Sequence, residues 1–239
     1  MVRGPAALLG AAALGLAYFL CAGALPDLGD GDAALVVAGA AGMLAIAAIA
    51  LSLVWAAGDA LAPVGLVLLG AGLVLGAMDA AGLGVEAVVP EALVAGAFGI
   101  LMGRVLAHYA GPAVGLAIPL FVALVDAWSV ASGPSSSLAQ GDTRGAAELT
   151  FDLPALGGGG DAIARLGLPD AIFIACFATW AHRLGLRPRA TAAGMVCGLL
   201  ATIVLSVVTD RAIPALPLVA VGYWLPNLDR LAGLMKAPE

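Results

Sequence analysis

The stretch Arg165-Leu-Gly-Leu-Pro-Asp170-Ala-Ile-Phe173 places a carboxylate at the start of a long apolar segment. A charged side chain in the hydrocarbon region of a bilayer costs about 2.5 kcal/mol or more on insertion scales, so it is normally retained with a partner and a function. The preceding apolar segment carries a second acid, Asp126. We therefore expect Asp126 to be the partner of Asp170.

The composition of the whole chain indicates a membrane protein. Hydrophobic residues make up 62% of the 239 residues and charged residues only 11%, whereas a soluble protein is about half apolar and about a quarter charged. The sequence therefore predicts an all-α polytopic membrane protein. Its many Ala and Gly residues favour close packing of helices through small-residue faces.

The cysteines and histidines are poorly placed for metal binding. Cys21, Cys176 and Cys197 lie in apolar runs, without the spacing of a disulfide framework or a metal site, and we expect them to be small core residues. His108 and His182 have no second ligand at helical spacing. We therefore expect no metal, no other cofactor and no nucleic-acid partner.

A window of about 19 residues finds about eight apolar segments long enough to span a bilayer. They cover residues 6–25, 33–57, 62–78, 87–106, 113–132, 166–181, 190–208 and 213–228. The first segment is longer than the apolar part of a secretory signal peptide, so we favour a retained helix.

These segments divide the chain into three parts. Residues 1–132 form an N-terminal transmembrane bundle, residues 133–165 a loop, and residues 166–239 a C-terminal transmembrane region. The loop is rich in Gly, Ser and Pro, which is typical of a flexible linker. Within it, residues 148–153 alternate between polar and apolar, a pattern that favours a short strand.

The basic residues predict the orientation in the cell membrane. If the N-terminus is cytoplasmic, the outer segments carry only Arg144, Arg165 and Arg211, and the inner segments carry the other Lys and Arg residues. Because basic residues favour the cytoplasmic side, both termini are predicted there. The segment 183–189 is the strongest anchor and is expected to contact anionic lipids. We also expect Asp229 to pair with the adjacent Arg230.

Three unusual features fall at one depth of the predicted bilayer. Asp126 lies about 10 Å and Asp170 about 7 Å from the outer ends of their segments, at 1.5 Å per residue. The segment Pro214-Ala-Leu-Pro217 begins three residues after Arg211, at the outer start of the last segment. Because Pro169 and Pro214 lack backbone donors, and irregular backbone at membrane depth must line protein or water, we expect a wet pocket there.

Two carboxylates in such a pocket cannot both ionise cheaply, so they share a proton and titrate as a pair. One carboxylate can then take a proton from water while the other polarises a carbonyl, as in an aspartic protease. A helical substrate must unwind before its carbonyl can be attacked, and an unpaired strand edge can hold the unwound segment.

The positions of Asp126, Gly167-Leu-Pro-Asp170 and Pro214-Ala-Leu-Pro217 resemble the three signatures of the presenilin and signal peptide peptidase family of intramembrane aspartyl proteases, in a divergent, prokaryotic-type form. The resemblance covers the C-terminal half. It implies a presenilin-like helix arrangement with Asp126 and Asp170 as the catalytic pair. The substrate-binding residues that it implies are Ile163, Ala164, Arg165, Leu166, Gly167, Leu168, Pro169, Pro214, Ala215, Leu216 and Pro217.

The chain also departs from the family pattern. Val125 stands where the family usually has Tyr, and Pro169 where it usually has Gly. We count about four segments before the first aspartate, where the family has five. The predicted orientation is similar to the signal peptide peptidase branch, which implies transmembrane peptide or protein substrates with a cytoplasmic N-terminus.

Three other interpretations fit the same residues. The two acids can be separate interfacial side chains that reach toward water. They can relay protons in a proton-coupled transporter, although the chain shows no inverted halves. The chain can also be an inactive relative that binds membrane helices without cutting them, since Pro169 replaces a glycine.

Overall fold

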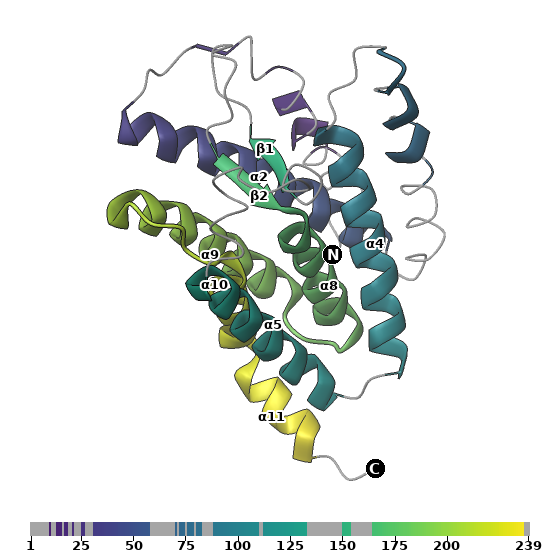
Figure 1. Cartoon of the computed structure of the whole chain (residues 1–239). Helices are drawn as coiled ribbons and strands as arrows, with labels where there is room; N and C mark the ends of the chain where they lie inside the picture. The colour runs from purple at the N-terminus through teal and green to yellow at the C-terminus, as the bar shows by residue number, and fades with distance from the viewer. Residues whose placement is uncertain are drawn as a thin grey trace.

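The computed structural model describes residues 31–57, 88–109, 112–132, 150–153 and 164–236, together with scattered residues between 10 and 26 and between 70 and 82. The described part is almost entirely helical, with one pair of short strands (Figure 1). In chain order its elements are α2 (Asp32–Ala57), α4 (Val88–Tyr109), α5 (Pro112–Ser132), β1 (Thr150–Leu153), β2 (Ala164–Gly167), α8 (Leu168–Arg183), α9 (Pro188–Thr209), α10 (Ala215–Trp224), the 3-10 turn η3 (Leu225–Asn227) and α11 (Leu228–Lys236).

The helices agree with the apolar segments of the sequence where the two can be compared. α2, α4, α5, α8 and α9 each begin and end close to a predicted segment. Among the described residues, three stretches are long and apolar enough to cross a membrane, namely Asp32–Ser52, Ala113–Ser132 and Pro188–Thr209. The predicted segments 6–25 and 62–78 lie largely outside the described residues. A membrane protein is therefore supported, and the number of eight spans remains a prediction.

The last predicted segment, 213–228, is not one uniform helix. α10 has only 10 residues before the α-helical hydrogen bonding is interrupted at η3, which contains Pro226. Proline lacks an N–H and cannot donate to the preceding turn. The helical path then continues as α11 to Lys236, beyond the predicted end. Hydropathy detects the apolar residues of such a segment but not this change of helix type.

Glycines bring two pairs of helices into close contact. In α4, a Cβ added at Gly99 would lie 2.6 Å from the Ile172 carbonyl oxygen of α8, and one at Gly103 would lie 2.8 Å from the Thr179 Cβ. In the same way, Gly194 of α9 lies against the backbone of Gly222 in α10. Lipid tails supply no hydrophobic drive between helices, so such close backbone contacts are how membrane helices gain packing energy.

The core is centred on α8, whose Phe177 and Trp180 are buried. The Phe177 ring stacks on Trp180 with centroids 6.3 Å apart and lies 5.3 Å from the ring of Tyr223 on α10. Cys176 is also buried, whereas Cys21 and Cys197 are exposed. The expectation of core cysteines is thus correct only for Cys176.

The two strands form an antiparallel pair at the start of α8 (Figure 1). Thr150 pairs with Gly167 and Leu153 with Ala164. The strand predicted within 148–153 is therefore confirmed, and it belongs to a sheet with the segment that leads into α8. Most of the loop 133–165 lies outside the described residues, so its flexibility remains a prediction.

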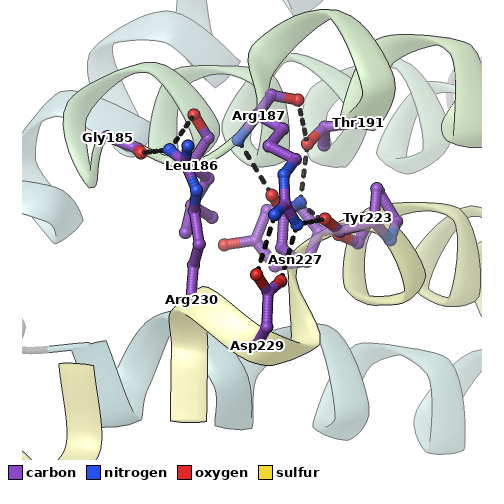
Figure 2. A network of polar contacts seen from close by, with 9 residues as sticks. Gly185, Leu186, Arg187, Thr191, Tyr223, Asn227, Asp229 and Arg230 are labelled. Carbon is purple, nitrogen blue, oxygen red and sulfur yellow. Dashed lines mark hydrogen bonds and ion pairs between the residues drawn. The ribbon is translucent and has the colours of Figure 1, made fainter. Parts of the chain in front are cut away.

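At the C-terminal end of α8, residues of η3 and α11 hydrogen-bond to the loop that leads into α9 (Figure 2). The Arg187 guanidinium donates to both carboxylate oxygens of Asp229, at 2.6 and 2.7 Å, and to the Pro226 carbonyl oxygen at 2.6 Å. Arg230 donates instead to the carbonyl oxygens of Gly185 and Leu186. The predicted Asp229–Arg230 pair is therefore wrong, because the fold brings a more distant arginine into a two-pronged contact.

Candidate active site

The turn from β2 into α8 places the first carboxylate. Gly167 is the N-cap of α8 and has extended backbone angles, φ −66° and ψ 135°. Leu168 and Pro169 are the first two helical residues, where a proline is tolerated because the N–H that it lacks has no partner within the helix. Pro169 therefore fits the turn, and the backbone at Gly167 is one that any residue adopts.

Gly167 is required for a different reason, namely space for the Asp170 carboxylate. A Cβ at Gly167 would lie 3.1 Å from Asp170 Oδ2, closer than most real contacts of a Cβ. The Gly167 backbone also hydrogen-bonds to this carboxylate. Asp170 is the third residue of α8, and an acid at that position commonly reaches back to the N-cap N–H. The glycine thus holds Asp170 in a fixed position.

The second carboxylate, Asp126, is a half-buried residue of α5. Its Oδ2 accepts a hydrogen bond from the backbone N–H of Leu216, 3.0 Å away, across 90 residues of sequence. Leu216 lies in the first turn of α10, where N–H groups have no intrahelical partner. The N-cap of α10 is Pro214, which makes no side-chain capping bond. Asp126 therefore caps α10 from a neighbouring helix.

These contacts bring the two predicted catalytic residues together. α10 packs against α5, α8 and α9, and the charge of Asp126 acts on the carboxyl group of Asp170. Each carboxylate lies at the N-terminus of a helix, Asp170 at α8 and Asp126 at α10. Helix N-termini carry a partial positive charge that favours a nearby anion. The arrangement can thus favour a negative charge in apolar surroundings.

The other predicted site residues that the structure describes lie in β2, in the first turn of α8 and at the start of α10. Ala215 and Leu216 are buried, and Pro214 and Pro217 are half-buried in the first turn of α10. Pro169 is exposed beside Asp170. Of the remaining members, Ala164, Arg165, Leu166 and Gly167 form β2 and Leu168 begins α8. Ile163 lies outside the described residues.

One property of the site was not evident from the sequence. Leu216 contributes its backbone N–H, and the nearby prolines were the only signal. Within the part of the chain that the structure describes, no three His, Cys, Asp or Glu side chains are grouped to hold an ion.

Comparison with known proteins identifies no relative of this chain. No family model matches the chain, and neither a curated protein nor a solved structure matches it.

Proposed function

We propose that this chain is an intramembrane aspartyl protease, which hydrolyses peptide bonds within transmembrane helices or signal peptides. The observation that supports the proposal is the meeting of Asp126 and Asp170, two acids from separate apolar helices, beside the first turn of α10. Acids at such depth are rare unless they have a function. The resemblance assigns the Pro214–Pro217 segment to the active site, and the Leu216 N–H of this segment donates to Asp126.

In the proposed reaction the two carboxylates share one proton. The ionised carboxylate removes a proton from a water molecule, whose oxygen attacks the carbonyl carbon of the substrate. The protonated carboxyl group donates its hydrogen to the carbonyl oxygen, which gives a neutral tetrahedral diol. A proton is then passed to the amide nitrogen, the C–N bond breaks, and an acid and an amine leave.

The backbone donors around the pair prepare it for this chemistry. Leu216 N–H fixes one oxygen of Asp126, and the Gly167 backbone fixes Asp170. The remaining carboxylate oxygens are then available for water and for the substrate carbonyl. Donors that are already oriented cost no rearrangement during the reaction, which is a main source of enzymatic rate enhancement.

The substrate of the proposed enzyme enters as an unwound segment. β1 pairs with one edge of β2, and the two strands are the whole of this sheet among the described residues. β2 leads directly into α8 and Asp170. Its other edge is suited to pairing with an added substrate strand. With both termini in the cytoplasm, as the basic residues predict, substrates would be single helices with a cytoplasmic N-terminus.

The first test is cleavage of a fluorogenic transmembrane peptide by the purified protein in proteoliposomes. Asp126→Asn and Asp170→Asn should each lower turnover by about 100- to 10,000-fold, because each removes one partner of acid–base catalysis. The asparagine introduced by Asp126→Asn keeps a side-chain oxygen that can accept the Leu216 N–H. The thermal unfolding temperature of this variant should therefore stay close to that of the wild type.

The exposed acid Asp32 supplies a matched control, because Asp32→Asn should leave cleavage unchanged. Undiminished turnover in either dyad variant would refute the proposed mechanism. Proton-driven solute uptake without cleavage would indicate a transporter, and saturable peptide binding without products would indicate an inactive relative.

A further inference from the structure

Asn227 is a buried polar residue of η3, and its side chain makes three hydrogen bonds, to Arg187, Thr191 and Tyr223 (Figure 2). Its Nδ2 donates to the Thr191 hydroxyl and to the Tyr223 carbonyl oxygen, both at 2.7 Å. Its Oδ1 accepts from the backbone N–H of Arg187 at 2.9 Å. One side chain therefore joins the last turn of α10 to the first turn of α9.

Without Asn227, the Arg187 N–H would lose this acceptor and the Thr191 hydroxyl would lose this donor. Arg187 is the N-cap of α9 and makes no side-chain capping bond of its own. The Thr191 hydroxyl already donates to the Arg187 carbonyl oxygen at 2.8 Å, so it is free to accept from Asn227. A buried donor or acceptor left without a partner costs about 1–3 kcal/mol. The network is therefore specific for an amide at this position.

The interface between α9 and α10 needs such a contact to define its register. Gly194 meets Gly222, and Gly198 meets the Leu218 backbone, so the two backbones touch with no side chain between them. A contact between glycines has no protruding side chain that would prevent one helix from sliding along the other. A single buried asparagine is a known means of fixing the register of packed helices.

The register of α10 matters at its other end, roughly 16 Å away along the helix at 1.5 Å per residue. There the Leu216 N–H meets Asp126 Oδ2 at 3.0 Å. On its C-terminal side Leu216 is followed by Pro217, which has no N–H to offer. If α10 moved along its axis so that Pro217 took the place of Leu216, Asp126 would lose its backbone donor.

We propose that Asn227 is a positioning residue of the aspartate pair: it fixes α10 against α9 so that the Leu216 N–H reaches Asp126. This role rests on the proposed protease function, since it assigns to Asn227 a part in the same site. Asn227 touches neither carboxylate and acts through α10 alone.

The proposal is tested by separating turnover from substrate binding in Asn227→Ala. We expect kcat to fall by about 10- to 100-fold, because a displacement of about 1 Å in a catalytic group has that effect, while KM stays within about twofold. Thr191→Val, which removes one partner of Asn227, should lower kcat in the same direction, and Thr191→Ser should restore it. Asp229→Asn is the matched control, since it breaks the neighbouring surface ion pair and leaves Asn227 in place.

A disulfide cross-linking assay, which does not depend on catalysis, tests the role of Asn227 separately from the proposed protease function. Asp126→Cys and Leu216→Cys, in a chain whose own cysteines are replaced by alanine, should form a disulfide under mild oxidation. Adding Asn227→Ala should slow this cross-linking at least about fivefold if the helix loses its register by about a residue, and Asp229→Asn should not.

Each result has a defined meaning. A wild type that cleaves nothing defeats the protease proposal, while cross-linking still decides the role of Asn227. Unchanged cross-linking in both Asn227→Ala and Thr191→Val would overturn that role. An unchanged kcat in these variants would overturn it as well.

Discussion

The two ends of α10 satisfy their polar groups in opposite ways. At the C-terminal end, the buried amide of Asn227 makes three hydrogen bonds, and Arg187 binds both Asp229 and Pro226. At the N-terminal end, Asp126 accepts one backbone hydrogen bond. The polar groups at the C-terminal end are held by several hydrogen bonds, whereas the Asp126 carboxylate at the N-terminal end keeps acceptor positions available.

This difference separates a stabilising network from a site for chemistry. An ionised carboxylate has about four acceptor positions, so one backbone bond leaves most of them for water or substrate. At the dyad end, the N-cap residues Gly167 and Pro214 make no side-chain capping bond of their own. A region selected only for stability would fill these positions. The partly satisfied end is therefore where we place function.

The largest effect that tests this comparison is expected at Gly167. Gly167→Ala adds a methyl group 3.1 Å from Asp170 Oδ2, so the carboxylate must move by a few tenths of an ångström. We expect kcat to fall by about tenfold in the peptide cleavage assay, because small displacements of catalytic groups are costly. The fold should persist, since the backbone angles of Gly167 suit alanine.

The other end of the molecule offers the matched substitution. Gly233 of α11 has nothing within 4 Å of an added Cβ, so Gly233→Ala should leave kcat unchanged and raise helix stability by up to about 1 kcal/mol. Equal losses of activity in both variants would mean that Gly167 has no special relation to Asp170.

The helices were largely predictable from the sequence, because each one is determined by the hydrophobicity of its own segment. A run such as 113–132 is apolar apart from Asp126 and two serines, and only a helix satisfies its backbone in a bilayer. The result is α5, which begins at Pro112 and ends at Ser132. The same reasoning predicted that Asp126, Asp170 and Pro214 share one level, because depth follows from residue counts along a helix.

The contacts between helices were not predictable, because they depend on distant partners. Asp229 lies beside Arg230 in the sequence, yet its partner is Arg187, 42 residues away. Asn227 was not singled out at all, since an amide near the end of an apolar segment resembles any interfacial residue. Similarly, Pro169 in place of the family's usual glycine made an inactive relative one interpretation of the sequence, whereas its position in the first turn of α8 suits a proline.

A smaller effect concerns the pH dependence of the stabilising end. The Arg187 guanidinium lowers the pKa of Asp229 below its ordinary value, through its hydrogen bond and its charge. A lowered pKa in the folded state means that the pair stabilises the protein above about pH 4 and loses this contribution as the pH falls further. We expect Asp229→Asn to unfold at a lower temperature than the wild type at pH 7.

The two unfolding temperatures should converge as the pH is lowered toward 3, measured in detergent at low salt. Both side chains are largely exposed, so the difference should be small and should decrease in high salt. A difference that persists unchanged at pH 3 would show that the Asp229 side chain acts through packing and not through its charge.

The smallest expected effect lies in the loop that leads to Pro214 and to the dyad. Asp210 ends α9 in the left-handed region, with φ 50°, and is exposed. A negative charge at a helix C-terminus opposes the helix dipole, whereas asparagine tolerates the same backbone without the charge. Asp210→Asn should therefore stabilise the protein by about 0.5 kcal/mol, which corresponds to about 1–2 °C in unfolding temperature. If the variant is instead less stable, the Asp210 carboxylate has a favourable partner at the dyad end, and the contrast between the two ends of α10 is weaker than we argue.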